Sequence, residues 1–131
     1  MKLPPQVLYT LSPLVEAARG EPLLEPALEL AAADEARIVL QSEQGIFTFD
    51  RAARRVLHGD AEVAAFDEVR SVDINAFPGG RGAPSWGLSL YCSFLRRVAL
   101  GRTYDDGNAS VLAARLARAL GCKVVAVALK R

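Results

Sequence analysis

The sequence predicts an α+β fold, in which an antiparallel sheet is capped by a C-terminal amphipathic helix and preceded by a pair of N-terminal helices. Three observations carry this prediction. Apolar residues at helical spacing occupy much of 1–35, short β-branched and aromatic runs separated by turns occupy 37–100, and a capped amphipathic stretch follows at 105–121. With 131 residues, 51% of them hydrophobic and 24% charged, the chain can bury one hydrophobic core.

Residues 1–35 are expected to form an N-terminal helical segment. Ser12-Pro13 is typical of an N-cap followed by the first helical residue, and Gly20 can end that helix. From Pro22 to Ala33, apolar residues recur at three- and four-residue steps, which predicts a second helix. Because proline is tolerated only in the first turn, Pro26 leaves the start of this helix uncertain.

Residues 36–131 are expected to form one domain that contains the sheet, its closing helix and a terminal strand. Polar and glycine-containing turns separate short apolar runs, as an antiparallel meander requires. The predicted strands are 37–41, 46–49, 55–58, 62–66, 69–74, 86–92 and 97–100, with the longest loop at 75–84.

The clearest helix begins after Asp105, whose side chain can cap it, and ends at Gly121, which can adopt the left-handed conformation. Its apolar stripe, at steps of three and four, predicts that the helix lies on the sheet. The following run, 123–129, is apolar on both faces and β-branched, and therefore predicts a strand that must pair either with its own sheet edge or with a second copy. The candidate edge-pairing residues are Val124, Val125, Val127 and Leu129.

Strands in a meander followed by a capped helix resemble the pleckstrin-homology-like (PH-like) superfold. Residues 46–56 are similar to the second hairpin of bacterial PH-like domains, 66–72 to the next strand, and 108–121 to the closing helix. The resemblance implies a bent antiparallel barrel plugged by its last helix, and a docking role. The 42–45 turn carries only an acidic charge, unlike the basic first hairpin of lipid-binding members.

The net charge is only +1, which argues against a protein that coats polyanions, although the halves differ. Residues 1–50 carry three bases and eight acids, and the remainder carries 13 bases and seven acids. Two hairpins rich in arginine would form one basic surface if they were neighbours, whereas solvated strand edges are the simpler interpretation. The candidate binding residues are Arg51, Arg54, Arg55, Arg96, Arg97 and Arg102.

A second candidate contact is the glycine-rich loop, where Arg81 and Trp86 offer the charged and aromatic anchors favoured at interfaces. Metal and thiol chemistry have little support. His58 is the only histidine, and Cys92 and Cys122 lack zinc-ligand spacing, so we expect no metal, cofactor or catalytic residue. The two cysteines are expected to be reduced thiols, with a single bridge between them as the alternative.

These observations predict a non-enzymatic interaction or docking module in a bacterial cytoplasm, whose partner is another protein or a second copy of the chain. The alternative is a peripheral domain that binds anionic phospholipid through its arginine turns. Nucleic acid is not expected as a partner. No apolar run reaches the roughly 18 residues that a membrane-spanning helix needs.

Overall fold

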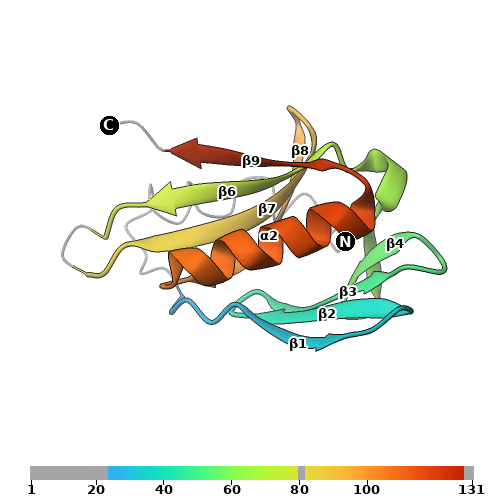
Figure 1. Cartoon of the computed structure of the whole chain (residues 1–131), viewed down its shortest axis with the longest axis horizontal. Coiled ribbons are helices and arrows are strands. Elements are labelled where there is room, and N and C mark those ends of the chain that lie inside the picture. The colour runs from blue at the N-terminus through green and yellow to red at the C-terminus, as the bar shows by residue number, and fades with distance from the viewer. Residues whose placement is uncertain (1–23, 80–81, 129–131) are drawn as a thin grey trace, which may run out of the picture.

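The computed structural model describes residues 24–79 and 82–128. Strands hold 54% of these residues and form two sheets, followed by one α-helix (Figure 1). The elements are β1 (Glu29–Ala33), β2 (Arg37–Ser42), β3 (Gly45–Asp50), β4 (Arg55–His58), β5 (Ala61–Ala65), the 3-10 helix η1 (Phe66–Glu68), β6 (Ser71–Phe77), β7 (Ser85–Ser93), β8 (Arg96–Thr103), α2 (Asp106–Leu120) and β9 (Lys123–Ala128). The described part is therefore mainly β, which corrects the expected α+β class.

The first sheet is an antiparallel meander of β1 to β5 in sequence order. Its central pair, β2 and β3, has an unbroken register from Arg37 opposite Asp50 to Ser42 opposite Gly45. Bulges occur only at its margins, with one extra residue on β1 and one on β5. The strands that periodicity predicts from 37 to 66 all lie in this sheet.

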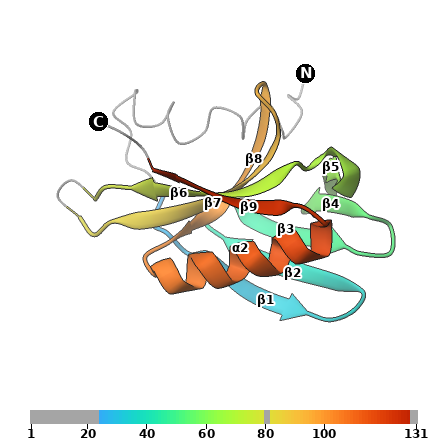
Figure 2. The ribbon, with the colours of Figure 1, turned by 45° about the horizontal axis from the view of Figure 1, so that its top comes forward.

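The second sheet has the order β8-β7-β6-β9. Strands β6, β7 and β8 are antiparallel, and α2 then crosses this sheet so that β9 joins β6 in parallel, with Ser71 opposite Lys123 and Ala76 opposite Ala128. Figures 1 and 2 show α2 packed along one face of this sheet, on the side of the first sheet. The predicted terminal strand therefore pairs with its own sheet edge, and Leu129 lies outside the described residues.

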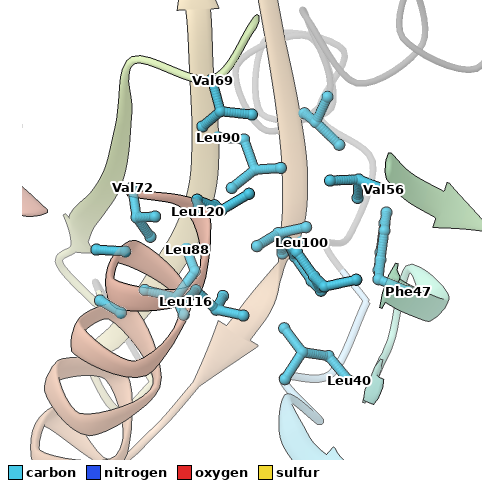
Figure 3. Packing of buried hydrophobic residues seen from close by; sticks show 14 of the residues in the cluster. Leu40, Phe47, Val56, Val69, Val72, Leu88, Leu90, Leu100, Leu116 and Leu120 are labelled. Atoms are coloured by element: carbon cyan, nitrogen blue, oxygen red, sulfur yellow. The ribbon is translucent and has the colours of Figure 1, made fainter. Parts of the chain in front are cut away.

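One hydrophobic core fills the space between the two sheets and α2. Alternate residues of the strands point inward, as the period of two requires. Figure 3 shows the inward side chains converging from both sheets and from the helix. The largest fully buried side chains are Phe47, Phe49, Phe66, Leu40, Leu88, Leu90, Leu100, Leu116, Val56, Val63, Val72 and Val98.

The two ends of α2 confirm the predicted caps. The Asp105 carboxylate accepts the Asn108 N–H at 3.2 Å, which satisfies one of the free donors of the first turn. Gly121 adopts φ 77° and its N–H donates to the Ala117 carbonyl, a left-handed ending that residues with a Cβ adopt at a cost. The buried stripe faces the second sheet.

The predicted N-terminal helical pair is wrong where the structure describes it, and the first helix, 12–20, lies outside the described residues. Residues 24–28 have no regular structure, and 29–33 form β1 rather than the second helix. All five β1 residues are exposed, so a helix here has no core for its apolar stripe, whereas pairing with β2 satisfies the backbone. The expected boundary after residue 35 falls in the β1–β2 turn.

Candidate functional site

Each of the candidate arginines contacts a partner within the described chain. Arg54 pairs with Asp67 at 2.7 Å and lies over the Phe66 ring, 5.6 Å from its centroid. Arg55 pairs with Glu62 on the neighbouring strand. These surface pairs contribute little stability, but they neutralise the charge that a phosphate would need.

Arg96 and Arg97 begin β8 and also have acidic partners. Arg96 pairs with Glu68 at 2.7 Å and donates to the Val63 carbonyl. The Arg96 guanidinium and the Ala65 N–H hold the pKa of Glu68 below its usual value. Arg97 lies over the Tyr91 ring at 5.0 Å and is 3.5 Å from a buried carboxylate, Asp73, which also accepts a hydrogen bond from Ser71.

The other two arginines are also occupied. Arg102 lies 3.7 Å from the Glu43 carboxylate, donates to the Leu24 carbonyl and contacts the Phe77 ring, while Arg51 donates to the Asp34 carbonyl at 3.4 Å. The six candidates are therefore distributed among separate structural contacts. Their side chains stabilise turns and strand ends rather than forming one anion site.

The candidate loop places Trp86 on β7, where the indole is half-buried against the core. Arg81 lies outside the described residues. Trp86 therefore belongs to the packing of the second sheet rather than to an exposed loop anchor.

The thiols and the histidine occupy structural positions. Both cysteines are free, and burial raises the pKa of the Cys92 and Cys122 thiols, which lowers their nucleophilicity at neutral pH. His58 stacks on Phe47 with centroids 4.4 Å apart, and its Nε2 lies 2.6 Å from the Gln44 carbonyl oxygen. Across the described residues, 24–79 and 82–128, no group of three potential metal ligands comes together.

A shallow depression of about 510 Å³ lies between η1 and the end of α2. It contains two cationic side chains, Arg54 and Arg118, but Asp67 neutralises the first. The last turn of a helix carries the negative end of its dipole, which disfavours a bound anion. The depression therefore offers little to an anionic ligand.

The edges of the sheets differ in how they are protected against further pairing. In the first sheet, β1 and β5 each carry a bulge, and β5 is short. In the second sheet, the Leu100 and Arg102 carbonyls of β8 accept hydrogen bonds from the Ser42 hydroxyl and the Leu28 N–H. Bulges and covering groups are the usual means by which proteins block strand addition.

Strand β9 has no bulge, and no covering group from the part of the chain that the structure describes. Its six pairs with β6 run without a bulge, it contains no proline, and Lys123 is its only charge. Val124 is 40% exposed. No strand of the described residues, 24–79 and 82–128, pairs with the outer side of residues 123–128, which we call the β9 edge. The sequence predicts the strand, but only the topology shows which of its sides is left for a partner.

The tip of the β7–β8 hairpin is a feature that the sequence analysis missed. Phe94 is 82% exposed and Leu95 is 70% exposed, and both lie between the two strands. Two-residue turns favour glycine, asparagine and aspartate, so two large apolar residues here are unusual. Two large apolar residues in a predicted turn are therefore the sequence signal that could have identified this exposed tip.

Within the part of the chain that the structure describes, no helix has the length and apolar character needed to cross a membrane. The comparisons with known proteins give no family for the chain. No protein-family model, curated protein or solved structure matches it.

Proposed function

We propose that this chain is a non-enzymatic docking module that accepts an extended segment of a partner protein onto the β9 edge. The observation that carries the proposal is the contrast between this edge and the three protected ones. The PH-like relationship stays part of this proposal only through the order of the elements, in which the strands β1 to β8 precede α2, and the parallel strand β9 lies outside that pattern. Free, deactivated thiols suit the reducing cytoplasm that we propose for it.

Strand addition suits the chemistry of this edge. A regular strand presents alternate N–H and C=O groups outward, and an added segment converts them from water-bonded groups into a ladder. The valine-rich composition of β9 gives such a segment apolar neighbours on both faces. Because main-chain bonds supply much of the affinity, the partner need share only an extended conformation and apolar alternation.

The charges near β9 select one end of the partner segment. Lys123 begins the strand, and Arg118 lies in the last turn of α2 just before it. A carboxylate on the partner segment beside Lys123 would therefore be favoured, and β9 itself carries no carboxylate that a second copy could offer there. We infer a different protein, rather than a second copy, as the occupant.

The remaining features favour binding over catalysis. The described carboxylates of Asp67, Glu62 and Glu68 are engaged by arginines, and both thiol pKa values are raised. General acid–base catalysis needs groups that converge on a substrate. Glu62, Asp67 and Glu68 instead contact neighbouring arginines.

The β9 edge can be tested with Val124→Lys, which places a charge beside the edge in the way that natural edge strands are protected. The probe is a synthetic peptide of alternating valine and threonine with glutamate at both ends. We expect it to shift the backbone amide NMR signals of β9 in the native protein, and not in V124K. Because Val124 is partly exposed, V124K should change the free energy of unfolding by only about 0.5 kcal/mol or less.

Two controls separate strand addition from general adhesion. Val111→Lys adds the same charge at an exposed valine on α2 and should leave peptide binding intact. A peptide with lysine at both ends should bind at least several-fold more weakly. Unchanged β9 signals at high peptide concentration would refute the proposal. A dimer in sedimentation that V124K disrupts would show that a second copy occupies the edge instead.

A further inference from the structure

We infer that the tip of the β7–β8 hairpin, Phe94 and Leu95, inserts into the interface of an anionic phospholipid membrane. This surface is separate from the β9 edge. The inference rests on the hairpin and on Arg70 beside it, and it would stand if strand addition at β9 were disproved.

The first support is the shape of the tip. The hairpin projects away from the sheets in both Figure 1 and Figure 2. Phe94 and Leu95 therefore occupy a convex extremity, with most of each side chain in water. Removing such side chains from water is favourable in proportion to their apolar area. A lipid interface accepts a convex apolar tip of any shape, whereas a protein partner must provide a matching pocket.

The second support is that the turn is held in place. The Ser93 hydroxyl accepts the Leu95 N–H at 3.3 Å. Arg96, directly after the tip, is anchored by the Glu68 carboxylate at 2.7 Å and by the Val63 carbonyl, which ties the start of β8 to η1 and β5. A tip that is already ordered loses little conformational freedom when it binds.

The third support is the charge behind the tip. Arg70 joins the base of the hairpin through its N–H, which donates to the Tyr91 carbonyl at 2.8 Å. Its side chain is exposed, and no carboxylate of the described chain lies within ion-pair distance of it. Arg97 lies at the start of β8, but its guanidinium is paired with the Asp73 carboxylate at 3.5 Å. Arg70 is therefore the cationic side chain that this end of the hairpin offers to an anionic surface.

Apolar side chains at the front and a cationic one behind match the layers of an anionic bilayer, where headgroup charge lies outside the acyl boundary. Each basic residue near such a surface adds a salt-sensitive attraction. Two apolar side chains and one unpaired arginine give reversible rather than permanent attachment, as a single lipid chain does. We therefore expect binding that saturates only at high lipid concentration.

The test is co-sedimentation of the full chain with vesicles of phosphatidylcholine mixed with phosphatidylglycerol, and with vesicles of phosphatidylcholine alone. We expect pelleting with the anionic vesicles that falls as salt rises. Phe94→Ser should weaken the partition coefficient about tenfold or more, because it removes the largest apolar contact. Arg70→Ser should weaken binding less, and only at low salt. Phe94→Trp should gain fluorescence that brominated acyl chains quench, measured as the difference from native Trp86.

Ile46→Ser is the matched control, since it removes an exposed aliphatic side chain from β3 in the other sheet, and it should bind as the native protein does. Val124→Lys should also retain vesicle binding, which keeps this result independent of the β9 edge. Absence of pelleting with anionic vesicles at low salt would overturn the inference. Pelleting that Phe94→Ser leaves unchanged would also overturn it, because arginine attraction alone would then explain it.

Discussion

The two edges of the second sheet end in different ways. At β8, the Ser42 hydroxyl donates to the Leu100 carbonyl, and the Glu43 carboxylate accepts the Arg102 N–H at 2.9 Å. At β9, the strand pairs with β6 on one side, and no described strand pairs with its other side. The β8 edge is completed by groups from the β2–β3 turn, whereas the β9 edge presents its backbone groups outward.

Because of this difference, we expect the β8 edge to affect stability and the β9 edge to affect binding. Substitutions where the β2–β3 turn meets β8 remove or distort contacts that are buried in the native state, and should lower the free energy of unfolding. Substitutions at β9 alter an exposed side of the molecule and should change association instead. The largest losses of stability are therefore expected on the β8 side.

Gly101→Ala should have the largest effect. Gly101 adopts φ 141°, and a Cβ there would lie 2.4 Å from the Ser42 Cβ and 2.6 Å from its hydroxyl. Backbone strain and overpacking each cost about 1–3 kcal/mol, so we expect a loss of about 4 kcal/mol, measured by urea unfolding. Gly59→Ala is the control, because Gly59 also has positive φ, at 59°, but has open space around it. Equal losses in both variants would rule out the contact with Ser42 as the cause.

Glu43→Ala should have the next largest effect. The Glu43 side chain is only 5% exposed, accepts N–H groups from Arg102 and Ala27, and pairs with the Arg102 guanidinium. Its removal leaves the partly buried Arg102 N–H without its acceptor and the Arg102 guanidinium without its carboxylate, which together cost about 2–3 kcal/mol. Glu43→Gln keeps an acceptor oxygen and should lose about half as much. If both variants lose equal stability in urea unfolding, the ion pair, and not the backbone donors, explains the effect.

Glu68→Gln should have the smallest effect, confined to acid. Arg96 and the Ala65 N–H lower the pKa of Glu68 from 4.5 in the folded state. A lowered folded pKa gives stability that is present above pH 4.5 and is lost as the pH falls through the folded value. The native protein should therefore lose more stability than E68Q on going below pH 4.5, as thermal unfolding across that range would show. Asp67→Asn is the control, because Asp67 is an exposed carboxylate in the same segment. If D67N reduces the loss of stability in acid as much as E68Q does, Glu68 makes no specific contribution.

Strand periodicity predicted most of the second half of the fold. Alternation over 86–92 and the caps at Asp105 and Gly121 are local signals, and β7 and α2 follow them closely. The segment 22–33 misled the prediction because alanine and leucine suit a helix intrinsically, whereas pairing of Glu29–Ala33 with β2 overrides that preference. The parallel partner of β9 was not predictable, because β6 lies far away in the sequence.

The candidate surfaces were less predictable than the fold. The sequence shows which residues are arginines but not which acids they contact. The pairs form only when β4, β5, η1 and β8 assemble: Arg54 with Asp67, Arg55 with Glu62, and Arg96 with Glu68. Phe94 lies between two predicted strands, and an apolar residue at that position is also typical of the end of a strand. Its 82% exposure depends on how far the hairpin projects from the sheets.

The parallel pairing of β6 with β9 also affects synthesis of the chain. Strand β6 ends at Phe77, and β9 begins about 45 residues later at Lys123. At roughly 5–20 residues per second, a ribosome needs about 2–9 seconds to make that interval. Strand β7 (Ser85–Ser93) is made early in this interval, and from then until β9 follows, β6 has β7 on one side and its later partner still missing on the other. The growing polypeptide therefore passes through a stage in which the vacant flank of β6 is open to a chaperone or to another nascent chain.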